Sequence, residues 1–309
     1  MPRKKKTTQL FHEYFKEWIE LFKVGAVRGV TLQKYYLSLQ RIVELAPELK
    51  MNDLERKSYQ KLLNDYALTH EKQTTMDFHH QLKGAILDAV DEGLIERNPT
   101  RKIIIKGKPP REKKIKFLNQ FEVQALIKTL NLRDEINWDW FILLVAKTGL
   151  RFSEALALTP NDFDFSKQKI FVRKTWNYKV TKGEFQPTKN ESSKRKIQLD
   201  WQIAMQFSQL IRNMSTNEPI FVKGRVFNST VNNRLKALCL KANIPVVTIH
   251  GLRHTHASLL LFAGVSIASV ARRLGHSSMT TTQETYLHII HELENQDNDK
   301  IMRHLSSLM

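Results

Sequence analysis

Residues 248–260, TIHGLRHTHASLL, hold three histidines and an arginine within seven positions. Side chains of these types at this spacing fit three roles: metal ligands, core residues, or donors to a phosphate. His250 and Arg253 are three residues apart, so on a helix they project from one face. There an imidazole and a guanidinium can converge on one phosphate, the guanidinium through two hydrogen bonds.

The other two roles remain open for the remaining histidines. His250 and His254 could share a helix face as zinc ligands, but His256 points away and the chain has one cysteine, Cys239, so the pattern disfavours a metal site. The apolar run at residues 259–262 makes core positions the better interpretation for His254 and His256 taken singly. We therefore expect no metal and no other cofactor.

The 309 residues include 49 Lys and Arg against 31 Asp and Glu, a formal net charge of +18. Residues 1–114 hold 23 basic and 15 acidic side chains (net +8), and residues 115–309 hold 26 and 16 (net +10). Excess charge in both halves indicates a polyanion held from two sides, most often nucleic acid. The alternative is a basic protein with no such partner.

Other classes are not indicated by the sequence. No apolar run is long enough to cross a bilayer, and the basic start has no apolar signal segment after it. The single cysteine fits a reducing compartment. We expect a bacterial cytoplasmic protein associated with the nucleoid, without a membrane partner.

The first hundred residues show helical spacing of apolar side chains. Thr31 can cap a helix that ends before Pro47, and residues 82–90 carry a stripe that Gly93 can stop. A basic segment at residues 97–116 follows, with nine Lys and Arg, three prolines and one glycine. We interpret it as a cationic connector, either solvated or lying along a phosphate backbone. The linker proper is placed at residues 108–116, after a helical domain at residues 1–107.

The second domain, residues 117–309, begins with a predicted capping box at Asn119 and Glu122. An apolar helix then ends at Gly149, and Arg151 opens a further short helix. The pieces KIFVRKTW and RKIQL, at residues 169–176 and 195–199, favour short strands. Helices resume near residue 231. The predicted fold class is mainly α with a small antiparallel β-sheet (α+β).

A lone His-x-x-Arg is a weak signal, but its order among other elements is specific. TGLRFSEALAL lies upstream, PTKNESSKRKI lies between, and LGHSSMTTTQETYLH lies downstream. Together these residues resemble the tyrosine recombinase (phage integrase) family over the whole second domain. The residues that match the family's catalytic set are Arg151, Lys189, His250, Arg253, His276 and Tyr286.

The resemblance implies a site-specific recombinase that cuts and rejoins DNA without metal or ATP. Tyr286 would attack phosphorus and form a 3′-phosphotyrosyl link, while the arginines and His250 offset negative charge. Lys189, expected in a β-hairpin turn, would protonate the departing 5′-oxygen, and His276 would support the phosphate or the tyrosine. Glu154 is interpreted as a buried group that orients the cationic site.

The family also implies an arrangement and partners. The two domains would form a C-shaped clamp on double-stranded DNA, with a homotetramer on paired sites, a directionality factor and a host DNA-bending protein. The tail, with Ile301, Met302, Leu305 and Leu308 at helical spacing, would dock on a neighbouring protomer or fold back in cis. Contacts to the DNA backbone are expected from Lys102, Lys106, Lys108, Lys113, Lys114, Lys194, Arg195 and Lys196.

The subtype is more open. The long segment 172–199 is typical of integrases of phages and conjugative or genomic-island elements, whereas resolvases of the Xer type usually have a shorter hairpin. Only MPRKKKTT precedes the helical domain, so we expect simple recombination sites or a shortened chain. An Xer-like resolvase, a type IB topoisomerase, and a DNA-binding regulator with a vestigial site are the alternatives.

Overall fold

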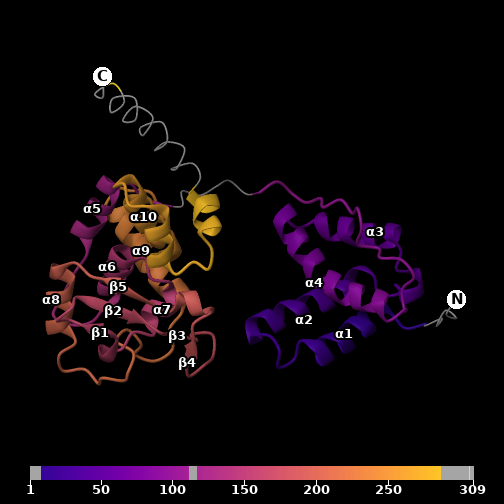
Figure 1. Cartoon of the computed structure of the whole chain (residues 1–309), viewed down its shortest axis with the longest axis horizontal. Coiled ribbons are helices and arrows are strands. Elements are labelled where there is room, and N and C mark those ends of the chain that lie inside the picture. The colour runs from indigo at the N-terminus through magenta and orange to yellow at the C-terminus, as the bar shows by residue number, and fades with distance from the viewer. Residues whose placement is uncertain (1–7, 111–116, 287–305, 307–309) are drawn as a thin grey trace. The chain divides into compact units, whose positions relative to one another are not determined.

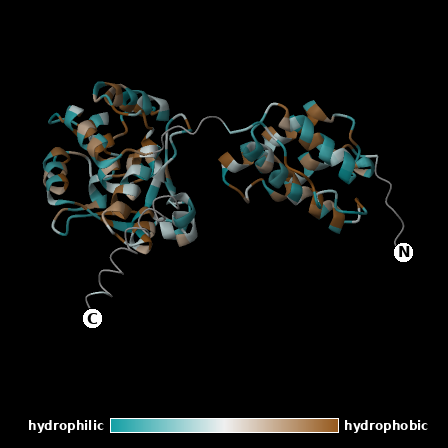
Figure 2. Ribbon diagram, turned by 90° about the horizontal axis from the view of Figure 1, so that it is seen from above, coloured by the Kyte–Doolittle hydropathy of each residue, from teal (hydrophilic) through white to brown (hydrophobic). Residues whose placement is uncertain are grey.

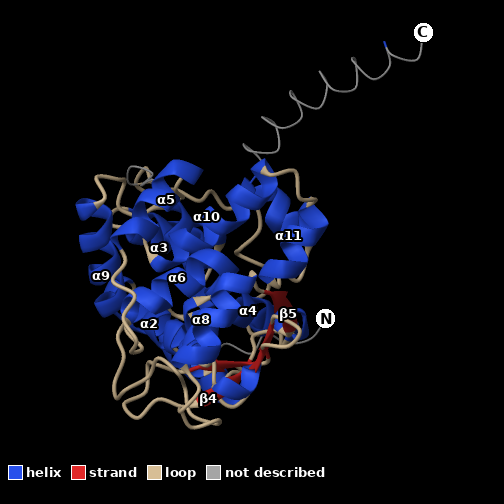
Figure 3. Cartoon of the chain, turned by 90° about the vertical axis from the view of Figure 1, so that its left-hand side faces the viewer, coloured by secondary structure: helices blue, strands red, loops and turns tan. Residues whose placement is uncertain are grey.

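The computed structural model describes residues 8–110, 117–286 and 306 (Figure 1). The chain divides into two compact units, Met1–Lys113 (the N-terminal unit) and Lys114–Met309 (the C-terminal unit). Helices predominate and the strands are few and short (Figure 3). The predicted class, mainly α with small antiparallel sheets, is confirmed.

The N-terminal unit is helical throughout its described residues. Its α1 and α4 are tied by a hydrogen bond of 2.6 Å from Trp18 Nε1 to Asp88 Oδ2, beside the stacked rings of Phe15 and Trp18. The predicted stripe on α4 is buried, and Gly93 has the left-handed φ of 74° expected after the helix. The elements are α1 (Phe11–Phe22), α2 (Gly29–Leu45), η1 (Met51–Asp53), α3 (Arg56–Ala67) and α4 (Lys72–Asp91).

One prediction for this unit was wrong. Helix α2 begins at Gly29 after Arg28, so Thr31 lies inside its first turn rather than at its cap. Within the basic segment at residues 97–116, the residues up to Lys108 are bound to the N-terminal unit. Gln60 bonds both the N–H and the carbonyl of Ile104 at 2.8 Å, and Lys108 N–H donates to the His70 carbonyl.

The C-terminal unit surrounds helix α6, whose side chains are buried nearly all round. Among its described residues the helices are α5 (Gln120–Thr129), α6 (Trp138–Thr148), α7 (Phe152–Leu156), α8 (Trp201–Leu210), α9 (Asn228–Lys241), α10 (Ile249–Phe262) and α11 (Ile267–Leu274), with 3-10 turns η2 (Pro160–Asp162) and η3 (Glu191–Ser193). Residues 279–286 are also helical. Apolar and polar segments alternate along the helices of each unit (Figure 2), as amphipathic elements on a core require.

The β insertion forms two antiparallel sheets. The strands are β1 (Phe163–Asp164), β2 (Lys169–Val172), β3 (Lys174–Trp176), β4 (Phe185–Pro187) and β5 (Arg195–Gln198), in the orders β1-β2-β5 and β3-β4. Because β2 runs on into β3 and their partners are β5 and β4, the four strands form one long, bent hairpin. Its closing turn is residues 177–184, and residues 188–194 bulge between β4 and β5.

Local signals place the helices that carry the site. The capping box forms as predicted, with Asn119 N–H to Glu122 Oε2 at 2.7 Å and the reciprocal bond at 3.0 Å. Gly149 ends α6 with φ 67°, and a Cβ there would lie 2.7 Å from His256 Cδ2. Only glycine therefore allows the chain to turn after α6 while α10 packs closely against it. Among the described residues, no helix has the length and apolarity needed to cross a membrane.

Candidate active site

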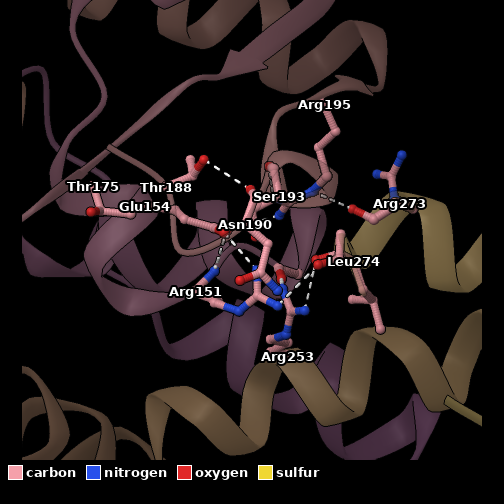
Figure 4. Close-up of polar contacts among 12 residues, drawn as sticks. Arg151, Glu154, Thr175, Thr188, Asn190, Ser193, Arg195, Arg253, Arg273 and Leu274 are labelled. Carbon is pink, nitrogen blue, oxygen red and sulfur yellow. Dashed lines mark hydrogen bonds and ion pairs between the residues drawn. The ribbon is translucent and has the colours of Figure 1, made fainter. Parts of the chain in front are cut away.

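Arg151 lies at the turn between α6 and α7, two residues after Gly149. Its guanidinium donates from Nη1 to Glu154 Oε1 at 2.7 Å and from Nη2 to the Gly275 carbonyl at 3.1 Å (Figure 4). Its backbone N–H donates to Glu154 Oε2 at 2.9 Å. The side chain is 34% exposed, so this cation is fixed in direction and still accessible to an anion.

Arg253 projects from α10 and is held at the ends of two other helices. Nη1 donates to the Gly149 carbonyl and Nη2 to the Leu274 carbonyl, each at 2.7 Å, and the residue is 3% exposed. Burial and the charge of Arg151 lower the pKa of Arg253 to about 9, so the guanidinium is still charged at neutral pH. A guanidinium has five N–H groups, and these two carbonyls use two of them.

The carboxylate of Glu154 binds two arginines, Arg151 and Arg195. It is 1% exposed and accepts hydrogen bonds from Arg195 Nη1 at 3.1 Å and Nη2 at 2.8 Å, in addition to that from Arg151. Burial by itself would raise the pKa of this carboxyl, but the hydrogen bonds and charge of Arg195, with the charge of Arg151, hold the pKa below its ordinary value. Glu154 is thus an ionised, buried group beside Arg151, and it orients that guanidinium.

The structure differs from the prediction for Arg195, which we expected on the DNA backbone. Its side chain is 5% exposed, and besides Glu154 it donates to the carbonyls of Ser193 and Arg273. The physical reason is strand alternation on β5, which turns Arg195 and Ile197 inward and Lys196 outward. Reading KRKIQ as a strand with one inward face would have detected this from sequence.

Tyr286 ends the described part of the helix that begins at residue 279. The residue is 2% exposed and packs in a cluster with four apolar side chains: Ala257, Leu261, Val270 and Leu274. Burial raises the pKa of the Tyr286 phenol to about 12, against the opposing charge of Arg253. The phenol is therefore protonated at neutral pH and covered by its neighbours.

His254 contacts that phenol, a relationship that sequence reasoning missed. His254 Nδ1 lies 2.9 Å from the Tyr286 hydroxyl. The ring of His250, one helical turn earlier, stands edge-on to that of His254, with centroids 4.7 Å apart. We had interpreted His254 as core. The available signal was its i, i+4 spacing from His250, which places both rings on one face of α10.

The environments of His250, His276 and His256 can be compared with their predicted roles. The side chain of His250 is exposed, and desolvation with the charges of Arg253 and Arg151 lowers its pKa. His276 lies 2.8 Å, by Nδ1, from Thr282 Oγ1, and burial with the same charges lowers its pKa to about 4. Both imidazoles are therefore neutral at pH 7. His256 is buried between the Ala146 carbonyl and Arg273 Nε, as a core histidine.

Lys189 lies in the bulge at residues 188–194, not in the closing turn of the hairpin where we expected it. Its side chain is exposed, whereas Thr188 and Ser193 are buried. Thr188 Oγ1 donates to the Asn190 carbonyl at 3.1 Å, and the Ser193 carbonyl accepts from Arg195 (Figure 4). The loop is thus anchored beside the Glu154–Arg195 pair, while Lys189 itself extends into solvent.

The remaining lysines predicted on DNA are on the surface where the structure describes them. Lys102, Lys106 and Lys108 are exposed on the N-terminal unit. In the C-terminal unit Lys194 pairs with Glu191 at 2.7 Å, and Lys196 Nζ lies 5.3 Å from the ring centroid of Phe171. Lys113, Lys114, and the tail positions Ile301, Met302, Leu305 and Leu308 lie outside the described residues. Within the described part of the chain, no cluster of three His, Cys, Asp or Glu side chains is arranged to hold a metal ion.

The model of the phage integrase family matches residues 116–292, more than half of the chain. The chain belongs to the phage integrase family. The match spans every residue of the predicted catalytic set, from Arg151 to Tyr286. Relatives within reach of sequence comparison include the integrase of Staphylococcus phage L54a, 25% identical over 331 residues that cover 95% of this chain and 93% of the relative.

Other similar family members are named either integrase or tyrosine recombinase. The ICEBs1 integrase of Bacillus subtilis is 28% identical and covers 69% of this chain and 61% of its own. Tyrosine recombinase XerC of the same species is 27% identical and covers 92% and 93%. Among solved structures, the Tn1549 transposon integrase in complex with a circular intermediate DNA has a TM-score of 0.74 at 19% identity, covering 89% of this chain and 94% of that one. At that identity the likeness shows the shared fold.

Proposed function

We propose that this family member is a site-specific DNA recombinase that cleaves and rejoins strands through a 3′-phosphotyrosyl intermediate on Tyr286. The observation that carries the proposal is the joint placement of three groups, Arg151, Arg253 and Tyr286. Arg151 and Arg253 donate to adjacent carbonyls at the end of α11, Arg253 also to the carbonyl that ends α6, while the phenol of Tyr286 is hydrogen-bonded to α10 one residue beyond Arg253. Cations and an oxygen nucleophile therefore share one site.

The chemistry of a phosphodiester explains the two arginines. Its negative charge repels a nucleophile, and the pentavalent transition state concentrates further charge on the non-bridging oxygens. Two guanidiniums, fixed by backbone carbonyls and by Glu154, offer preorganised donors that need no reorganisation during the reaction. His250, exposed on the turn of α10 before Arg253, adds a neutral donor.

The remaining residues of the predicted set have roles in proton transfer and in support of the phosphate. Lys189 protonates the 5′-oxygen as general acid, a role for which an exposed ammonium on an anchored loop is suited. His276, hydrogen-bonded to Thr282, supports the phosphate. The bond energy is kept in the phosphotyrosyl link, so a 5′-hydroxyl can displace the tyrosine without ATP.

Double-stranded DNA is the proposed partner, supported by the net charge of +18 and by the exposed lysines at residues 102–108. The solved relatives include a lambda integrase dimer bound to a core site, with a TM-score of 0.64 and 16% identity, covering 88% of this chain and 97% of that one. We also propose a homotetramer on paired sites, assisted by a directionality factor and a DNA-bending protein. The mass of the complex on one and on two duplexes tests the tetramer.

The decisive experiment compares the wild-type chain with Tyr286→Phe on nicked duplexes that carry the junction sequences of the encoding element. Without metal or ATP, a denaturing gel should resolve a covalent protein–DNA band for the wild type alone. Gel-shift binding should be equal for both, because the substitution removes one hydroxyl from an apolar cluster. An adduct formed by Tyr286→Phe would assign the nucleophile elsewhere, and binding without an adduct in either would indicate a DNA-binding regulator.

A further inference from the structure

The proton on Tyr286 must leave before or during attack on phosphorus. With the phenol pKa raised to about 12 by burial, only about one phenol in 10⁵ is ionised at pH 7. The charge of Arg253 favours the phenolate, but Arg253 cannot accept its proton, because a guanidinium has no acceptor atom. The reaction proposed above therefore needs a base in contact with this oxygen.

Among the described residues, the hydrogen-bonding partner of the phenol is His254. Its Nδ1 lies 2.9 Å from the hydroxyl, within the range of a direct proton transfer. Its backbone position is set by α10, which is fixed at Arg253, the adjacent residue, through two carbonyl bonds. The ring of His254 also packs perpendicular to the ring of His250, so its plane is constrained as well.

We propose, resting on the proposed function, that His254 is a catalytic residue whose Nδ1 accepts the phenolic proton as Tyr286 attacks phosphorus. The bond that forms joins the phenolic oxygen to phosphorus, and the bond that breaks joins phosphorus to the 5′-oxygen. That oxygen takes a proton from Lys189. In religation the 5′-hydroxyl returns its proton to Lys189, and His254 returns its proton to Tyr286.

The charged and titratable groups around this pair leave it as the acceptor. On α10 they are His250 and Arg253; from the segment after α11, His276; and from the turn before α7, Arg151, whose charge acts on His250 and His276. Each is cationic or already a candidate donor to the phosphate. The buried carboxylate of Glu154, whose charge acts on Arg253, is committed to Arg195 and Arg151.

The test measures the single-turnover rate of covalent adduct formation on the nicked duplex, with two substrates. One has the normal 5′-oxygen at the scissile phosphate, and the other has sulfur there, a leaving group that needs no general acid. His254→Ala should slow both substrates about a hundredfold at pH 7, and its rate should rise as the pH is raised. Lys189→Ala should be slow on the oxygen substrate and recover on the sulfur substrate.

A second variant separates a base from a positioning residue. His254→Asn places an amide near the position of Nδ1, where it can hydrogen-bond to the phenol but cannot take a proton. It should be as slow as His254→Ala; a wild-type rate would overturn the proposal and make His254 a positioning residue. The matched control is His256→Gln, two residues along α10 and facing the core, which should keep the wild-type rate.

The proposal can fail separately from the function on which it rests. If the wild-type chain forms no adduct while it binds DNA, the recombinase assignment fails. If the wild type forms an adduct, Tyr286→Phe forms none, and His254→Ala matches the wild type on both substrates, the base assignment alone is overturned. Gel-shift binding and circular dichroism of each variant identify a loss of rate that comes from unfolding.

Discussion

Glu154 and Arg195 form a buried ion pair in which Nη2 lies 2.8 Å from Oε2 and both side chains are at most 5% exposed. The pair joins α7 to β5 across 41 positions of sequence. Because Glu154 also binds Arg151, the pair connects the β insertion to an arginine of the proposed active site. The bulge that carries Lys189 ends on the same strand.

Removal of Arg195 should destabilise the C-terminal unit strongly. Arg195→Met leaves the Glu154 carboxylate buried without its main partner, and we expect the free energy of unfolding to fall by about 3–5 kcal/mol. Urea unfolding measures this loss. The control is Lys194→Ala, which breaks the exposed pair with Glu191 and should cost under about 1 kcal/mol. Equal losses for both variants would contradict the buried-pair interpretation.

Stability should depend on pH through His256. The Ala146 carbonyl can only accept and Arg273 Nε can only donate, so the neutral imidazole with hydrogen on Nδ1 satisfies both. Burial and the charge of Arg273 lower the pKa of His256 to about 3, against ~6.5 when unfolded. Between these values the unfolded chain binds a proton that the folded chain excludes, so stability falls as the pH is lowered from about 6.5 toward 3.

The contribution of His256 can be isolated by substitution. His256→Gln retains one donor and one acceptor and does not titrate. Urea unfolding at pH 7 and pH 5 should show a loss of stability for the wild type that exceeds the loss for the variant by about 2 kcal/mol. The same pH dependence in both proteins would mean that other groups are responsible.

The two arginines should differ when each is replaced by lysine. Arg253→Lys replaces two separate donor nitrogens with a single one on a shorter side chain, which does not match the geometry of the Gly149 and Leu274 carbonyls, so it should lose about 2 kcal/mol of stability as well as cleavage. The side chain of Arg151 is 34% exposed, so Arg151→Lys should lose less stability than Arg253→Lys. Cleavage should fall at least about a hundredfold in each. Thermal unfolding and adduct formation measure the two effects; an active Arg253→Lys would contradict its proposed role.

Exposed lysines of the basic segment should appear in the salt dependence of DNA binding. Lys106→Ala removes one proposed phosphate contact, so the slope of log affinity against log salt should decrease by about 0.9. Lys16→Ala on α1, exposed and paired with Glu20 at 4.0 Å, removes the same charge elsewhere and should leave the slope nearly unchanged. An equal decrease for both would indicate a general charge effect.

Much of the fold was predicted from sequence because its signals are local. The end of α6 at Gly149, the capping box at Asn119 and the strands at residues 169–176 and 195–198 each depend on residues within a few positions. The cap at Thr31 was mispredicted, because α2 begins at Gly29.

The sequence by itself determined which residue types are available for the reaction and in what order: two arginines, a lysine, two histidines and a tyrosine in family spacing. Only the tertiary structure decided which of them meet. Tyr286 and His254 are 32 positions apart, and Arg195 reaches Glu154 across 41. Such pairs form because packing of α10, α11 and β5 around α6 leaves these polar atoms buried together, where each needs a partner. Which polar atoms are buried together, and therefore need each other as partners, depends on the packing of distant elements and cannot be predicted from a local pattern of residues.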